Sequence, residues 1–195
     1  MKNSTILIRK RFENMKALII LENGFEDVEA LATVDILRRS KIEVTTASIY
    51  NTKIKTQSGH NIESQCLLKD LDISEFDFLI IPGGKAVFNV LDKESIVDDV
   101  IDYFYNDNKL ICAICAAPLL IGKRGYFKGM KYTCFPGCDE KILEGKNTGK
   151  GIEVNDRFIL AKSMYYSTEF ALSIIEKVQG VRQRKIVEAS IKGEN

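Results

Sequence analysis

The chain has 195 residues, of which 45% are apolar and 28% are charged, and its 28 basic and 27 acidic side chains nearly cancel. This apolar fraction excludes a disordered chain, and a formal net charge of +1 does not suggest a protein that wraps nucleic acid. His60 is the single histidine, which excludes metal sites that need two, so cysteines and carboxylates must carry any catalytic chemistry.

The first half of the chain alternates between β-rich runs and a helical pattern. Residues 1–14 read as an N-terminal extension, and Met15 is a possible alternative start. Residues 16–21 (KALIIL) are continuously apolar, which is typical of a strand covered on both faces. Residues 26–41 predict a helix, and residues 42–50 (IEVTTASIY) predict a β-branched strand. The helix places four apolar side chains on one face: Ala30, Leu31, Val34 and Leu37.

The same alternation continues to the end of the chain. The polar residues 51–70 suggest a short hairpin or edge element, and residues 77–81 (DFLII) predict a strand that ends at Pro82. Further strands are expected over residues 109–114 and 130–134, and a hairpin over 152–154 and 158–161. Helices are expected over residues 94–105, 116–121, 167–178 and 182–191, with Pro118 in the first turn of its helix.

Strands that alternate with helices predict an α/β fold with a mostly parallel sheet and helices on both faces. We expect one domain over residues 15–195, since no linker or repeat interrupts the pattern. The longest uncharged run covers about 13 residues, whereas a membrane span needs about 20, so no membrane association is expected. The N-terminus lacks the features of a signal peptide, and five cysteines without one indicate reduced thiols in the cytoplasm.

Ligands bind at the carboxyl ends of the strands in such a sheet, and Cys115 lies at one of these ends, where a strand gives way to a helix. The unpaired N–H groups and dipole of a helix N-terminus stabilise a thiolate and can lower its pKa. A turn of this kind also forces its central residue outward, as the nucleophile elbow does for serine. The alternative is a buried cysteine that acts as a small hydrophobe.

Two further strand ends add candidate groups. Glu29 lies in the first turn of the helix after the first strand, where it is either a dipole partner or a proton carrier whose pKa is raised by the crowding of Glu26 and Asp27. Gly83 and Gly84 follow the strand at 77–81 and predict either a plain tight turn or backbone N–H groups that bind an oxyanion.

Together these segments resemble the ThiJ/PfpI superfamily, in the branch that contains the parkinsonism-associated deglycase. The resemblance rests on six segments in family order: ALIILENGFEDVEA (17–30), DILRRSKIEVTTAS (35–48), DFLIIPGG (77–84), LICAICAAPLLIG (110–122), YTCFPG (132–137) and STEFALSIIE (167–176). It implies a flavodoxin-like three-layer sandwich, a homodimer, a reactive Cys115 and a Glu29 that hydrogen-bonds it. Gly84 and the backbone of Ala116 would line the anion pocket.

The resemblance also implies a function. Members of the superfamily are described as cofactor-independent glyoxalases, as deglycases, and as oxidative-stress sensors or chaperones. The expected substrate is a small reactive dicarbonyl such as methylglyoxal, or a glycated adduct, with no metal or nicotinamide required. A non-enzymatic sensor that oxidises Cys115 needs the same activated thiolate, so the sequence leaves both functions open.

The chain departs from the family pattern at two places. Many relatives carry Gly-Pro before the last conserved helix, where this chain has bulky side chains over residues 162–166 (KSMYY). Some relatives carry a histidine before the proline of the YTCFPG segment, where this chain has Phe135. A Cys-His dyad is therefore unavailable at that point, and Glu29 is expected to be the sole proton partner of Cys115.

Three other interpretations of the cysteines were weighed. A glutamine amidotransferase needs a histidine downstream of its nucleophile, but His60 lies upstream and is expected to be a surface turn residue. The C-x2-C and C-x3-C pairs, Cys112 with Cys115 and Cys134 with Cys138, approach zinc-ribbon spacing. The first pair also resembles a thioredoxin motif. A buried strand position for Cys112 argues against both sites.

Overall fold

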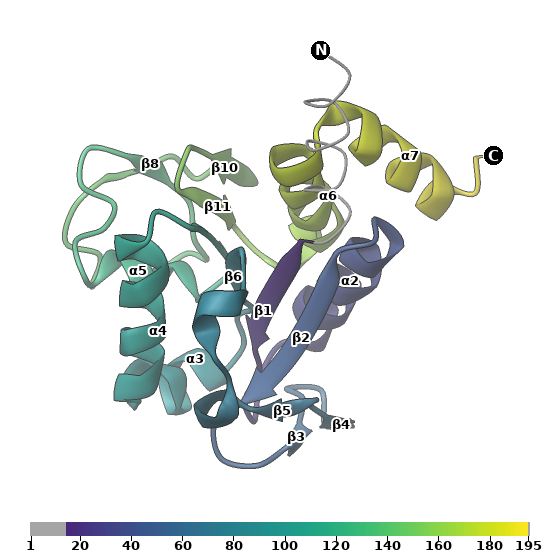
Figure 1. Ribbon diagram of the computed structural model, residues 1–195. Coiled ribbons are helices and arrows are strands. Elements are labelled where there is room, and N and C mark those ends of the chain that lie inside the picture. The colour runs from purple at the N-terminus through teal and green to yellow at the C-terminus, as the bar shows by residue number, and fades with distance from the viewer. Residues whose placement is uncertain (1–14, 195) are drawn as a thin grey trace.

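A seven-stranded sheet runs through the middle of the protein in the computed structural model, which describes residues 15–194 (Figure 1). Its strand order is β10-β11-β7-β6-β1-β2-β5, and all neighbouring strands are parallel except β10 and β11. The strands are β1 (Lys16–Ile20), β2 (Glu43–Ser48), β5 (Cys66–Leu67), β6 (Phe78–Ile81), β7 (Leu110–Ile114), β10 (Ile152–Val154) and β11 (Phe158–Ala161).

The sheet has the strand order of the flavodoxin-like fold. Numbered along the chain, its long parallel strands β2-β1-β6-β7-β11 are second, first, third, fourth and fifth. The order reverses between β1 and β6, and a crevice forms outside the carboxyl ends of strands at such a switch point. The predicted three-layer α/β sandwich is therefore confirmed, and the segments that follow β1 and β6 meet at its crevice.

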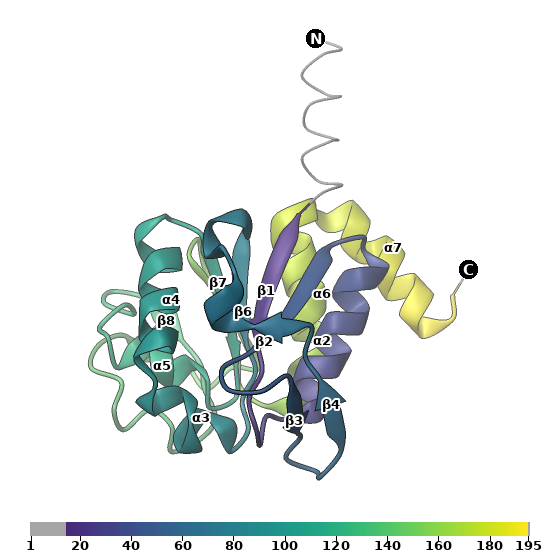
Figure 2. The ribbon, with the colours of Figure 1, turned by 60° about the horizontal axis from the view of Figure 1, so that its bottom comes forward.

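Helices cover both faces of the sheet (Figures 1 and 2). One face carries α2 (Asp27–Arg39), α6 (Ser167–Gln179) and α7 (Val181–Lys192), and the other carries α3 (Ala86–Asn89), α4 (Ser95–Asn106) and α5 (Pro118–Gly122). Two apolar clusters form the core, and the alternation along β7 feeds both: Ile111 and Ala113 join one cluster, Cys112 and Ile114 the other. No helix within residues 15–194 is long and apolar enough to cross a membrane.

The predicted elements are present, with three corrections. Leu31 is 42% exposed because it lies beside the buried face that Ala30, Val34 and Leu37 form at helical spacing. The strand expected over 130–134 shortens to β8 (Lys131–Tyr132), since its partner β9 (Lys146–Asn147) has only two residues. Helix α3 was not predicted. The N-terminal extension, residues 1–14, lies outside the described residues.

The polar segment after β2 forms the predicted hairpin from β3 (Lys53–Lys55) and β4 (Asn61–Glu63), which lies at the carboxyl-end edge of the sheet beside α2 (Figure 2). Its Lys55 carbonyl accepts a hydrogen bond from the Gly24 N–H at 2.7 Å, which ties it to the end of β1. Four short 3-10 turns complete the described elements: Leu68–Asp70, Ile73–Glu75, Leu91–Lys93 and Met164–Tyr166.

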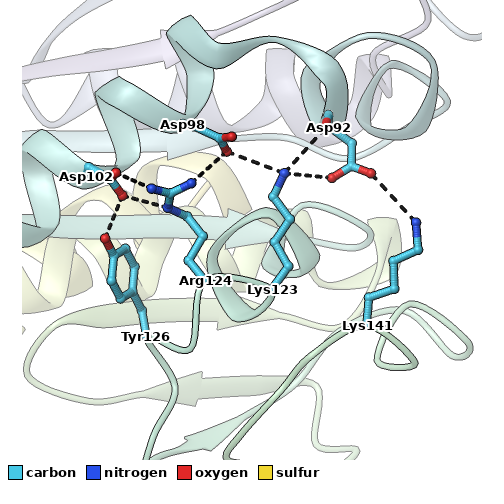
Figure 3. A network of polar contacts seen from close by, with 7 residues as sticks. All are labelled: Asp92, Asp98, Asp102, Lys123, Arg124, Tyr126 and Lys141. Atoms are coloured by element: carbon cyan, nitrogen blue, oxygen red, sulfur yellow. Dashed lines mark hydrogen bonds and ion pairs between the residues drawn. The ribbon is translucent and has the colours of Figure 1, made fainter.

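A network of charged side chains anchors the end of α5 to α4 (Figure 3). Arg124 donates to Asp102 in a bidentate pair, with its Nε 2.6 Å from Oδ1, and also lies 3.1 Å from Asp98. Lys123 lies 2.8 Å from Asp92 and 3.4 Å from Asp98. Since α5 follows β7 directly, this network fixes the position of the turn between them.

Candidate active site

Cys115 occupies the predicted elbow between β7 and α5. Its φ of 63° lies in the left-handed region, where a non-glycine residue costs roughly 1–3 kcal/mol and persists only under the control of its surroundings. Two backbone hydrogen bonds provide that control: the Cys115 N–H donates to Ala161 at 2.9 Å, and its carbonyl accepts from the Phe135 N–H at 2.8 Å. The elbow is thus held between the end of β11 and the loop at Phe135.

Glu29 comes to the same place from α2. Its carboxyl is almost fully buried, with 1% of the residue exposed, and Oε2 accepts a hydrogen bond from the Gly83 N–H at 2.7 Å. The other oxygen, Oε1, has no hydrogen-bond partner among residues 15–194. The carboxyl lies against the Cys115 thiol, so the predicted pair is brought together.

Gly83 sets the spacing of this pair. A Cβ at Gly83 would lie 2.7 Å from the Cys115 Cβ, 2.8 Å from Glu29 Oε2 and 3.1 Å from the Ala116 nitrogen. Only a residue without a side chain fits between the three groups. Gly83 was expected either to form a plain tight turn or to offer its N–H to an oxyanion. In the structure this N–H donates to Glu29, so Gly83 is a positioning residue.

Burial raises the pKa of the Glu29 carboxyl to about 7, although the Gly83 N–H and the Cys115 thiol oppose the shift. The direction agrees with the prediction, but the main cause differs: desolvation dominates, and the neighbouring Glu26 adds least. Crowding by Glu26 and Asp27 is visible in the sequence, whereas the depth at which the Glu29 side chain is buried is not.

Burial and the Glu29 carboxylate also raise the pKa of the Cys115 thiol, whereas the Ala116 N–H lowers it. The expectation that the helix terminus lowers this pKa is therefore wrong for the pair with Glu29 ionised, because the repulsion and desolvation outweigh the single N–H. The two groups are better described as sharing one proton. A thiolate forms when Glu29 holds that proton.

A pocket of about 420 Å³ opens onto the pair. Of the candidate site residues, Cys115, Glu29, Gly84 and Ala116 line this pocket, and Gly83 does not. Gly84 has a φ of +94°, and a Cβ there would lie 2.5 Å from both the Glu26 nitrogen and the Gly24 carbonyl oxygen. This close approach of two turns requires glycine.

Four exposed apolar or aromatic side chains line the pocket, Phe88, Phe135, Met164 and Tyr165, beside the exposed polar residues Gln57 and Lys85. Phe135 therefore lies at the pocket, at the position where some members of the ThiJ/PfpI superfamily carry a histidine. Of the bulky residues 162–166, Met164 and Tyr165 reach the rim, whereas the Tyr166 ring packs over Gly151. The departure leaves a pocket of about 420 Å³ in place.

Sequence reasoning missed Gln57 and did not place Cys138. Gln57 belongs to the loop of the β3–β4 hairpin, donates to Glu26 Oε2 at 2.8 Å and accepts from the Lys85 N–H at 2.9 Å. It therefore connects Glu26 to Lys85, and all three residues line the pocket. The hairpin itself was predictable, but no local pattern indicates which wall its loop contacts.

Of the remaining cysteines, Cys138 lines the pocket, whereas Cys66, Cys112 and Cys134 do not, and neither does His60. Cys112 is fully buried in β7, and all five cysteines are free thiols. Among the described residues, no three His, Cys, Asp or Glu side chains gather as metal ligands would. His60 is an exposed hairpin-loop residue, as predicted, and its Nδ1 lies 2.9 Å from Ser58 Oγ.

Comparison with known proteins gives a consistent result. Residues 15–177 match the model of the DJ-1/PfpI family. Protein dj-1beta of Drosophila melanogaster is 29% identical over 167 residues, which cover 84% of this chain and 89% of the relative. Its crystal structure superposes with a TM-score of 0.85 over 91% of this chain and 97% of that chain, at 28% identity. The glutathione-independent glyoxalase DJR-1.2 of Caenorhabditis elegans is 30% identical over the same shares of both chains.

Proposed function

The chain belongs to the DJ-1/PfpI family, and we propose that it is a cysteine-dependent glyoxalase or deglycase acting on methylglyoxal, glyoxal or their adducts. The observation that supports the proposal is the buried Cys115–Glu29 pair, in which a nucleophile lies against a proton carrier at the carboxyl ends of the strands. The similarity to a relative named as a glutathione-independent glyoxalase supports the same class of reaction.

The reaction begins with transfer of the shared proton to Glu29, which leaves Cys115 as the thiolate. The sulfur attacks the aldehyde carbon of methylglyoxal and forms a hemithioacetal. Glu29 gives its proton to the oxygen of the adduct and, now a carboxylate, takes the proton from the carbon bound to sulfur. It returns this proton to the adjacent carbon while the hydroxyl proton moves to the former ketone oxygen, which converts the hemithioacetal into a thioester of lactate. Water hydrolyses the thioester, so that one methylglyoxal and one water give one lactate.

The backbone at the pocket supplies the remaining groups. The N–H of Ala116 points to the reacting sulfur and, together with Gly84, is our candidate for binding the oxygen that gains charge when the thiolate adds. Gly83 holds the Glu29 carboxyl by its Oε2, which leaves Oε1 to face the substrate. No cofactor or metal takes part in these steps.

Lactate formation from methylglyoxal by purified protein tests the proposal. We expect turnover by the wild type, loss of turnover in Cys115→Ala and Glu29→Gln, and retention of it in Cys66→Ser, which removes a thiol on the edge strand β5. Circular dichroism and thermal unfolding confirm that each variant is folded. Turnover that survives in folded Cys115→Ala overturns the proposal.

An oxidation sensor is the second candidate. Oε1 of Glu29 has no partner among residues 15–194, so a protonated Glu29 is free to donate to an oxygen added to Cys115. In this case, the wild type shows no turnover of methylglyoxal but gains a stoichiometric sulfinate at Cys115 with peroxide. Mass spectrometry alongside the lactate assay separates the two functions.

We further propose that the protein works as a homodimer in the cytoplasm. Exposed apolar side chains support the dimer: Val28 and Leu31 on α2, and Met164 and Tyr165 at the pocket rim. Five free thiols support a reducing compartment. Light scattering coupled to size-exclusion chromatography tests the dimer, and a monomer at micromolar concentration would contradict it.

A further inference from the structure

A second thiol, that of Cys138, lines the pocket that holds Cys115. It is close enough for the charge of a Cys138 thiolate to raise the pKa of the Cys115 thiol, as the smallest of several causes after burial. Of the other cysteines, Cys112 is buried in the sheet, Cys134 is buried in the core, and Cys66 lies on the edge strand β5. Among the described residues that line this pocket, Cys115 and Cys138 are therefore the two thiols.

Backbone hydrogen bonds connect the two cysteines. The Cys115 carbonyl accepts from the Phe135 N–H at 2.8 Å, and the Phe135 carbonyl accepts from the Cys138 N–H at 3.0 Å. Cys138 thus ends a turn over residues 135–138, and the first residue of this turn is hydrogen-bonded to the elbow. The hydrogen-bonded turn therefore holds the Cys138 sulfur at the pocket.

Most of this turn lies at the surface. Its residues Phe135, Pro136 and Gly137 are exposed, and Gly137 has a φ of +83°. A disulfide needs Cα atoms about 4.4–6.8 Å apart. Cys138 itself is 8% exposed and belongs to an apolar cluster of the core, so the exposed residues 135–137 are the part of the turn that would adjust to this separation.

We propose that Cys138 is the resolving thiol of Cys115, so that hydrogen peroxide converts the pair into a Cys115–Cys138 disulfide. The Cys115 thiolate attacks one peroxide oxygen, the O–O bond breaks, and the departing hydroxide takes the proton held by Glu29 to form water. Cys138 sulfur then attacks the sulfenic sulfur of Cys115 and gives up its proton. The S–O bond breaks, and hydroxide and proton leave as a second water.

In this sequence, the two thiols supply two electrons and the peroxide accepts them. The disulfide withdraws Cys115 before a second peroxide can produce the irreversible sulfinate, and a thiol reductant restores it. The inference requires a reactive Cys115 but not turnover of a dicarbonyl, so it stands or falls separately from the glyoxalase proposal.

Peroxide treatment of the full-length reduced protein, followed by blocking of free thiols and peptide mass spectrometry, tests the proposal. We expect wild-type protein to lose two thiols per peroxide consumed and to yield a cross-linked peptide that joins Cys115 to Cys138. In Cys138→Ser and Cys138→Ala, Cys115 proceeds instead to sulfinate, at a level at least about fivefold above wild type. Cys134→Ser is the matched control and retains the cross-link.

The wild-type peptide map decides the matter even if a variant folds poorly. Cys115 sulfinate alongside a blocked, formerly free Cys138 overturns the proposal, and so does a disulfide between Cys134 and Cys138 or between two chains. A lactate assay on the same reduced sample reports separately on the glyoxalase proposal, because that reaction does not involve Cys138 sulfur.

Discussion

Replacing Glu29 by glutamine separates what this carboxyl does for catalysis from what it costs the fold. Burial raises its pKa from 4.5 to about 7, so between these pH values the folded protein holds a proton that the unfolded chain has released. Proton binding favours the state that binds more protons, which here is the folded state. The stability that Glu29 gains from its proton is fully present below pH 4.5 and is lost as the pH rises through 7.

The size of the effect follows from this interval. At 1.36 kcal/mol for each pH unit, the rise from 4.5 to about 7 corresponds to about 3 kcal/mol of stability lost by pH 8. Glutamine has the same shape, does not ionise, and can accept the Gly83 hydrogen bond through its amide oxygen. We therefore expect Glu29→Gln to be inactive, yet up to about 3 kcal/mol more stable than wild type at pH 8.

Urea unfolding at pH 5, 6, 7 and 8 measures this difference, provided that the denaturant slopes of the two proteins agree. The gap between variant and wild type is expected to open steadily from pH 5 to pH 8. Cys115 does not distort the comparison, since burial, the largest cause, raises the pKa of its thiol in the wild type and in the variant alike. Glu63→Gln, on the exposed edge of the β3–β4 hairpin, is the control and should run parallel to wild type.

Parallel stability curves for Glu29→Gln and wild type would refute the reasoning. They would mean that Glu29 ionises as readily in the folded protein as in the unfolded chain. The carboxyl would then carry no proton at neutral pH, and the shared-proton description of the Cys115–Glu29 pair would fail with it.

Three further predictions concern the same framework. Gly83→Ala places a Cβ 2.7 Å from the Cys115 Cβ, so kcat/KM for methylglyoxal should fall at least about tenfold and stability by about 1–3 kcal/mol; full activity would show that the spacing is not required. Arg124→Ala should lose about 1–2 kcal/mol in urea unfolding, against less than about 0.5 for the exposed Lys128→Ala, and equal losses would contradict the anchoring of α5. In Glu29→Gln, iodoacetamide should alkylate Cys115 faster than in wild type at pH 8, because the charge that raises the pKa of the thiol is gone; slower alkylation would contradict this effect of the carboxylate on the thiol pKa.

The sequence was sufficient to predict the sheet because its strands are buried on both faces and therefore consist of continuous apolar runs. β1, β6 and β7 all fall within one or two residues of the predicted boundaries. The ends of such strands converge whatever the details of their packing, so Cys115 and Glu29 could be expected to meet. The length of a strand at the edge was less predictable, as β8 shows, since it depends on where a partner ends.

Depth of burial and loop contacts could not be predicted in the same way. The first turn of α2 contains Glu26, Asp27 and Glu29, and nothing local distinguishes the one that is buried. The packing of α2 against the segment after β6 decides it, by bringing the Gly83 N–H to Glu29. Cys138 gave no local sign of sharing the pocket either, because hydrogen bonds between distant segments place its turn on the elbow.

The chemistry of the site and the instability expected at Glu29 have one origin. A proton carrier works best when its pKa lies near the working pH, because both of its forms are then populated. An exposed glutamate would be ionised at pH 7 and could not hold the proton that the Cys115 thiol must give up. Burial corrects this by raising the pKa to about 7, but the same burial penalises the ionised form in the folded state. A single glutamate can therefore replace the absent histidine only at a position where it weakens the fold.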